Sequence, residues 1–138
     1  MNRNLWLIAA ALVLLGTMTA SAQKTEFNVS VPFDFIVNGS SFPAGEYTFQ
    51  SVGVQGKVLS IRGVNSQTQG TIVSNDRRAS EPSQQTKLVF HRYGNQYFLA
   101  EVWQEGTDIG RTVPECLLEK QAATASRMKE VALTTARR

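Results

Sequence analysis

The chain of 138 residues contains one cysteine and one histidine, and these two scarcities exclude several kinds of site. Cys116 has no partner for a disulfide within the chain, so packing must supply the stability of the fold. Zinc and copper sites need several His or Cys ligands, and the chain has no CxxC, no HxxxH and no Asp-rich calcium loop. We therefore predict no metal site and no cofactor.

The shortage of histidine also limits catalysis. Any Ser-His-Asp or Cys-His machinery would have to be built around His91, and the local signatures of such nucleophiles are missing. Glycoside hydrolysis needs two carboxylic acids on either side of the bond that is cleaved. Glu101 and Glu105 lie near Trp103, an aromatic residue that could bind a sugar. Charged residues at strand ends are, however, ordinary solvated positions. The sequence thus favours a protein that is not an enzyme, and a hydrolase using His91 is the weaker alternative.

Long hydrophobic runs are equally scarce. The longest is the eleven-residue stretch from Leu5 to Leu15, which follows the positive charge of Arg3 and precedes a small-x-small site ending at Ala22. A membrane anchor is the alternative, but a spanning helix needs about 20 apolar residues. We predict a signal peptide over residues 1–22, cleaved between Ala22 and Gln23, and a secreted or periplasmic protein without a membrane span after cleavage.

Cleavage would leave residues 23–138, a length suited to a single domain. The formal charge falls from +3 to +2 because Arg3 is removed with the signal peptide. This value is too near neutral to indicate a nucleic-acid partner. Cys116 lies beside two leucines, which favours a buried small side chain over an intermolecular disulfide or a reactive thiol.

Most of this region alternates between apolar and polar residues with a period of two, which predicts β-strands. Turn signals separate the runs at Asn38-Gly39 and at Pro43-Ala44-Gly45. The polar segment 75–86 predicts a long loop. The predicted strands before that loop are Phe27–Val31, Phe33–Val37, Glu46–Val52, Lys57–Arg62 and Gly70–Ser74.

A hairpin is predicted next, with strands at 87–93 and 96–104 joined by Gly94-Asn95. Both of its strands carry apolar residues on both faces, which indicates a central position between layers. The two-residue loop sets a register. It places Arg92 opposite Tyr97, His91 opposite Phe98, Phe90 opposite Leu99, and Val89 opposite Ala100.

A short helix is predicted near 114–123. Thr112 and Glu115 have the spacing of a capping box, Pro114 fits the first turn, and Leu117, Leu118 and Ala122 form an apolar face. The segment 130–136 fits either a helix or a strand, and its β-branched residues favour a closing strand. The predicted fold is all-β: a single-domain antiparallel sandwich or flattened barrel of about seven to nine strands with one short helix in the C-terminal region.

Several fragments are familiar. Val31-Pro32-Phe33-Asp34-Phe35, Pro43-Ala44-Gly45-Glu46-Tyr47, and Phe90-His91-Arg92-Tyr93-Gly94 followed by Tyr97-Phe98-Leu99 and Val102-Trp103 make up strand and turn signatures. Over most of residues 27–120 the chain resembles a group of small exported β-rich proteins of unassigned function from environmental bacteria. The resemblance implies a β-rich scaffold and bacterial export, and it supplies no catalytic residue.

Binding is therefore the predicted role, with an envelope or extracellular protein, a glycan or a small ligand as the partner. Arginine forks and aromatic faces recognise anionic or sugar-like groups. A lipocalin-like carrier of a small apolar ligand is the alternative, although 116 residues is short for a roomy barrel. The residues predicted to form the binding surface are Arg77, Arg78, Arg92, Tyr93, Tyr97 and Trp103.

Overall fold

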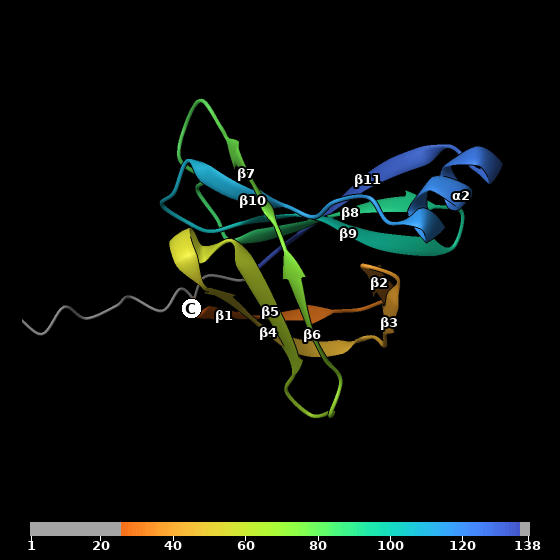
Figure 1. The fold of residues 1–138 in the computed structure, drawn as a ribbon, viewed down its shortest axis with the longest axis horizontal. Helices are drawn as coiled ribbons and strands as arrows, with labels where there is room; N and C mark the ends of the chain where they lie inside the picture. The colour runs from red at the N-terminus through yellow and green to blue at the C-terminus, as the bar shows by residue number, and fades with distance from the viewer. Residues whose placement is uncertain (1–25, 136–138) are drawn as a thin grey trace, which may run out of the picture.

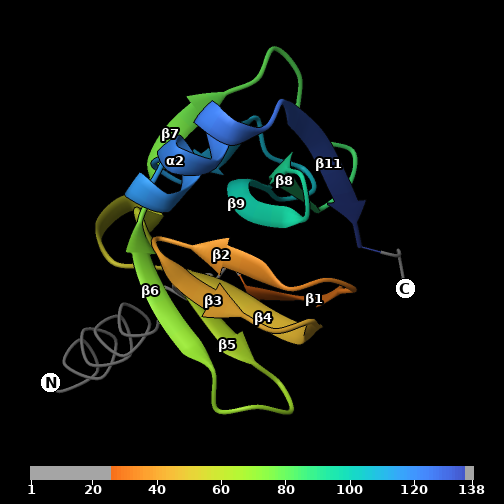
Figure 2. The same ribbon diagram turned by 90° about the vertical axis from the view of Figure 1, so that its right-hand side faces the viewer.

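The computed structural model describes residues 26–135, which fold into two β-sheets and one α-helix (Figure 1). The predicted signal peptide and the cleavage site between Ala22 and Gln23 lie outside the described residues. The all-β class is confirmed: two open sheets pack against each other as a sandwich and do not close into a barrel (Figure 2). No helix within residues 26–135 is long and apolar enough to cross a bilayer.

The smaller sheet has four antiparallel strands in the order β1-β4-β5-β6. Alternation decides their faces: Phe49 and Ile61 are buried between the sheets, whereas Thr48 and Ser60 lie on the outer face. A 3-10 turn, η1 (Val54–Gly56), joins β4 to β5. All four strands match their predicted positions to within one residue. They are β1 (Glu26–Val31), β4 (Gly45–Val52), β5 (Val58–Gly63) and β6 (Gln69–Val73).

The larger sheet has the order β11-β8-β9-β10-β7, and β8 and β9 are its central, buried strands. A hairpin of β2 and β3 joins it through one parallel pair, Ile36 with Phe98. The final strand confirms a strand rather than a helix for the predicted segment 130–136, although the strand begins at Met128 and ends at Thr134, and residue 136 lies outside the described residues. The bounds are β2 (Phe35–Val37), β3 (Ser40–Phe42), β7 (Asn75–Arg78), β8 (Lys87–Tyr93), β9 (Gln96–Trp103), β10 (Ile109–Thr112) and β11 (Met128–Thr134).

The predicted register of the β8–β9 hairpin is confirmed for the three pairs nearest its turn and wrong for the fourth. Val89 lies opposite Glu101 instead of Ala100, because a β-bulge interrupts the ladder between Val89 and Phe90. A bulge inserts one extra residue into a strand, so every side chain beyond it lies on the opposite face from the one that an uninterrupted ladder would give. As a result Val102 enters the core, and the Glu101 carboxylate lies on the outer face of the sheet.

Three short strands, β3, β7 and β10, were not predicted, so the described residues contain eleven strands instead of about seven to nine. The predicted loop over 75–86 is wrong for its first four residues, which form β7. This strand lies at the edge of the larger sheet, pairs only with β10, and is exposed along its whole length. An edge strand that is solvated on both faces needs no apolar alternation, so the pattern could not reveal it.

Strands β6 and β7 form one bent run that passes from the smaller sheet to the larger one (Figures 1 and 2). Buried Ser74 occupies the bend. Its backbone N–H and its hydroxyl both donate to the carbonyl oxygen of Lys57, at 2.7 and 2.8 Å. These two bonds tie the crossing point to the start of β5.

The helix, α2 (Leu117–Ala125), begins three residues later than predicted, and the predicted capping box is wrong. Cys116 is the N-cap, and Thr112 instead ends β10 and donates its hydroxyl to the carbonyl of Asn75 at 3.2 Å. The predicted apolar face is wrong for Leu117 and Leu118, which are exposed, and confirmed for Ala122, which is buried. The helix packs through Ala122, whose small side chain allows close approach to the sheet.

Aromatic rings fill the space between the sheets. The Phe35 ring is stacked on Phe42 and lies edge-to-face with Tyr47 and Phe90, at centroid distances of 5.2–5.6 Å. Phe42 also lies over Gly70, where an added Cβ would come within 2.9 Å of the ring. Both the β2–β3 hairpin and β6 are thereby held against one core.

Candidate binding site

The six residues predicted to form one binding surface lie in three separate places. Arg77 and Arg78 are exposed on β7, and Arg77 reaches Trp103 of β9 through Glu101, which contacts both residues. Arg92 and Tyr97 lie at the turn end of the β8–β9 hairpin. Tyr93 is buried beneath α2.

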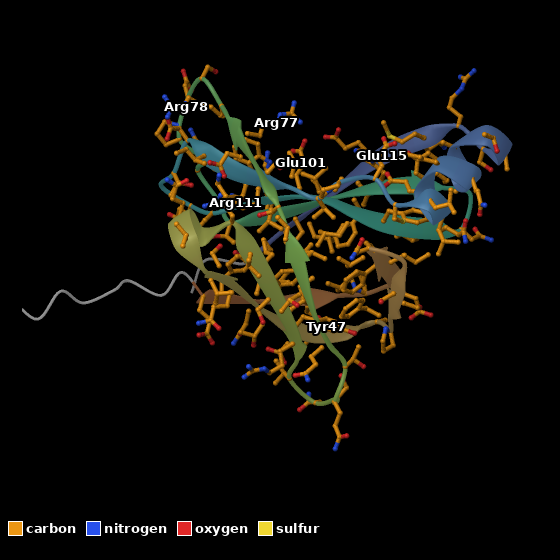
Figure 3. The ribbon with its side chains drawn as sticks, in the orientation of Figure 1. Tyr47, Arg77, Arg78, Glu101, Arg111 and Glu115 are labelled. Atoms are coloured by element: carbon orange, nitrogen blue, oxygen red, sulfur yellow. The ribbon has the colours of Figure 1, made fainter. Side chains whose placement is uncertain are left out.

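Arg77 belongs to a polar cluster on the outer face of the larger sheet (Figure 3). Its guanidinium forms an ion pair with Glu101, and the Trp103 indole N–H donates to the other Glu101 oxygen at 2.7 Å. Trp103 is only 7% exposed, so its ring does not offer a face for stacking on a sugar. The amino group of Lys87 lies 5.9 Å from the ring centroid. Arg78, by contrast, forms no ion pair with another described residue.

Arg92 and Tyr97 close one end of the core. The Arg92 guanidinium lies 5.3 Å from the Tyr97 ring centroid, and its Nε donates to the carbonyl of Gly94 at 2.8 Å. Tyr97 in turn is stacked on Phe33 at 3.8 Å between centroids. These contacts cover the Tyr97 ring, which the sequence predicted to be part of the binding surface.

Tyr93 and His91 share a buried carboxylate that sequence reasoning missed. Glu119 of α2 is 3% exposed; it contacts Nδ1 of His91 at 2.9 Å and accepts the Tyr93 hydroxyl at 3.3 Å. Burial, and then the charge of Glu119, raise the pKa of Tyr93 to about 12. The one available signal was the helical spacing of Glu119 and Ala122, which places both on the same face.

His91 therefore has a carboxylate neighbour, as a general base would. Cys116 packs against the Tyr93, Phe98 and Ala122 cluster at the start of α2, where it is partly buried. Among the described residues, no hydrogen bond joins Cys116 or a serine to His91, so no nucleophile is paired with the imidazole. The His91–Glu119 pair attaches the helix to the sheet.

A cavity of about 260 Å³ opens where the bent β6–β7 run separates from β10. We call this place the fork. Thr112 is still paired with Asn75, but the next residue, Val113, donates its N–H to Ala100 of β9 at 2.8 Å while the other strand crosses to the smaller sheet. The fork cavity is lined by Asn38, Ile72, Val73, Val113 and Pro114.

A second cavity of about 160 Å³ lies beside the turn between β3 and β4. Asp34 shapes this turn by accepting the Ala44 N–H at 2.8 Å. The Tyr47 hydroxyl donates to the carbonyl of Pro43, and burial followed by the charge of Asp34 raises the pKa of Tyr47. Internal hydrogen bonds thus use the Tyr47 hydroxyl and the Ala44 N–H of this cavity wall.

Comparison with known proteins gives no match, whether to a protein-family model, to a curated protein or to a solved structure.

Proposed function

We propose that this protein is an exported, noncatalytic binding or interaction module of the cell envelope or extracellular space. The observation that carries the proposal is the chemistry of the fork cavity. None of its five lining residues ionises, and four of them are apolar. Val73 on its rim is 68% exposed. A cavity of this kind suits an apolar side chain of a partner, whereas a reaction would need ionisable groups facing the substrate.

The polar clusters support the same proposal. Glu101 is paired with Arg77 and Trp103, and Glu119 with His91 and Tyr93, so each carboxylate serves to hold two elements together. A lipocalin-like carrier fits less well, because typical small-ligand pockets hold roughly 300–1,000 Å³ and the fork cavity holds about 260 Å³. Export is supported by the predicted signal peptide.

The His91–Glu119 pair keeps a hydrolase as the second candidate, since a carboxylate beside an imidazole orients a general base. The test separates the two functions. The immobilised protein is incubated with secreted and envelope fractions of the producing organism, alongside the variants Val73→Asp and His91→Ala. A binding module retains a partner on the wild type and on His91→Ala, and loses it on Val73→Asp.

Retention by all three proteins, or by none, would contradict binding at the fork. Turnover of a material in these fractions that stops in His91→Ala would favour the hydrolase instead. Both variants change side chains that are at least partly exposed, so circular dichroism suffices to check that their folds are intact.

A further inference from the structure

We propose that the free edge of β6 binds an extended peptide segment by strand addition, with one apolar side chain of the segment in the fork cavity. The proposal rests on the proposed function and deepens it, because it names the partner's chemistry and its mode of binding. Main-chain bonds to a sheet edge, combined with a pocket for one side chain, are the usual means by which a β-sheet protein recognises an extended peptide.

The hydrogen bonds at both ends of β6 identify its free edge. Gly63 N–H donates to the Thr68 carbonyl at 2.8 Å, and Ser74 N–H donates to the Lys57 carbonyl at 2.7 Å. In an antiparallel ladder every second residue makes such bonds. Residues 68, 70, 72 and 74 therefore face β5, and the backbone groups of Thr71 and Val73 face away from it. No backbone hydrogen bond of the described residues uses these groups.

The same alternation shows which way this edge faces. Ala79 N–H donates to the Asp108 carbonyl at 2.8 Å, so the odd-numbered residues of β7 are those that bond β10. Thr71 and Val73 are also odd-numbered and lie in the same bent run, so their backbone groups face the side of the run on which β10 lies. There Val113 and Pro114 have left the ladder and the fork cavity opens. An added strand would continue the line of β10, antiparallel to β6.

The pairing of an added strand with β6 determines which side chains the peptide needs. A residue opposite Ile72 directs its side chain inward, beside Ile72 and Val113, and should be apolar. Three positions later, opposite Gln69, the side chain lies on the outer face, on which the paired residue of β5 is Arg62. Arg62 is exposed and makes no ion pair with the described residues, so an acidic residue fits there. The expected motif is an apolar residue followed three positions later by an acidic one.

The free edge of β11 provides a matched control. Thr135 N–H donates to the Thr86 carbonyl, so the even-numbered residues of β11, including Ala132, face its unpaired side. This edge has the same exposed backbone groups, but neither of the two cavities described above adjoins it. Strand addition that depends only on a free edge would occur at β11 as readily as at β6.

The test pans a random heptapeptide library, displayed on phage, against the protein, and then measures the affinity of the selected peptides as synthetic molecules. Thr71→Pro removes one free-edge N–H of β6, and Ala132→Pro removes one of β11; neither donor serves the native ladders. We expect peptides with the apolar-to-acidic spacing, about tenfold weaker binding to Thr71→Pro, and unchanged binding to Ala132→Pro. Hydrogen exchange should slow at the Thr71 and Val73 amides when peptide binds.

Failure to select peptides, or equal binding by the wild type and Thr71→Pro, would overturn strand addition at β6, as would loss confined to Ala132→Pro. If Thr71→Pro does not fold, Val73→Asp is the replacement, because its charge enters the rim of the cavity and leaves the ladder intact. A partner that is captured in a Val73-dependent manner but binds Thr71→Pro normally would sustain the proposed function and refute this inference.

Discussion

At the scale of single residues, the buried carboxylate of Glu119 acts on the phenol of Tyr93. Burial raises the pKa of Tyr93 most, and the charge of Glu119, together with the hydrogen bond that it accepts from the Tyr93 hydroxyl, raises it further, to about 12 from an ordinary value of 10.0. The folded protein thus keeps a proton that the unfolded chain loses. The resulting stabilisation is complete below pH 10 and is lost as the pH rises through about 12.

We therefore predict that tyrosinate absorbance, taken as the difference between the wild type and Tyr93→Phe, has its midpoint at about pH 12. Glu119→Gln keeps the shape of the side chain and removes its charge, so the midpoint should fall toward 10.0. A wild-type midpoint near the ordinary value, or one that is unmoved by Glu119→Gln, would show that the carboxylate does not act on this phenol.

At the scale of elements, the packing of β10 against Trp103 requires a glycine at position 110. The Trp103 indole of the neighbouring strand lies against Gly110, where an added Cβ would come within 2.6 Å of the ring. We predict that Gly110→Ala destabilises the protein by about 1–3 kcal/mol through overpacking, measured by urea unfolding. Gly45→Ala is the matched control, because its Cβ would lie 4.0 Å from the nearest atom of Tyr47. Equal midpoints for the two variants would refute the packing argument.

The elements also show what a sequence pattern can reveal. Strands such as β4 and β5 bury one face, so their alternation fixes both their positions and their faces. The bulge beside Val89 and the polar strand β7 leave no such pattern, because pairing between strands determines them. The prediction for the helix face was wrong at Leu117 and Leu118 for the same reason. In the sequence, a glutamate such as Glu119 is expected to be solvated, and only the fold shows that it is buried with two hydrogen-bond partners on β8.

At the scale of the whole molecule, the sequence could not predict the fork. Its cavity brings Asn38, Val73 and Val113 together from three distant segments, and it exists because one bent run changes sheets. Arginines and aromatic residues are conspicuous in a sequence, and for that reason a sequence pattern points to them as binding residues. The fold uses Tyr93 and Trp103 for internal packing and leaves the less conspicuous valines at the surface opening.

The two sheets are also linked by one long side chain. Arg111 of β10 forms an ion pair with Asp76 on β7, and its Nη2 donates to the carbonyl of Gln55 in η1 at 2.6 Å (Figure 3). The larger sheet is thus connected to the turn that joins β4 to β5. Hydrogen bonds from charged groups contribute roughly 1.5–3 kcal/mol when they are partly buried, and this side chain is 17% exposed.

Arg111→Met should therefore lower the free energy of unfolding by about 1–3 kcal/mol, because methionine retains much of the aliphatic stem but cannot donate to Gln55 or pair with Asp76. Arg78→Met, on the exposed neighbouring strand, should change it by less than about 0.5 kcal/mol. Urea midpoints measure both effects. If the link between the sheets matters, hydrogen exchange in Arg111→Met should accelerate first around Gln55 and Gly56, where the guanidinium now lies. Equal stability of the two variants would mean that the sheets are held by their shared core alone.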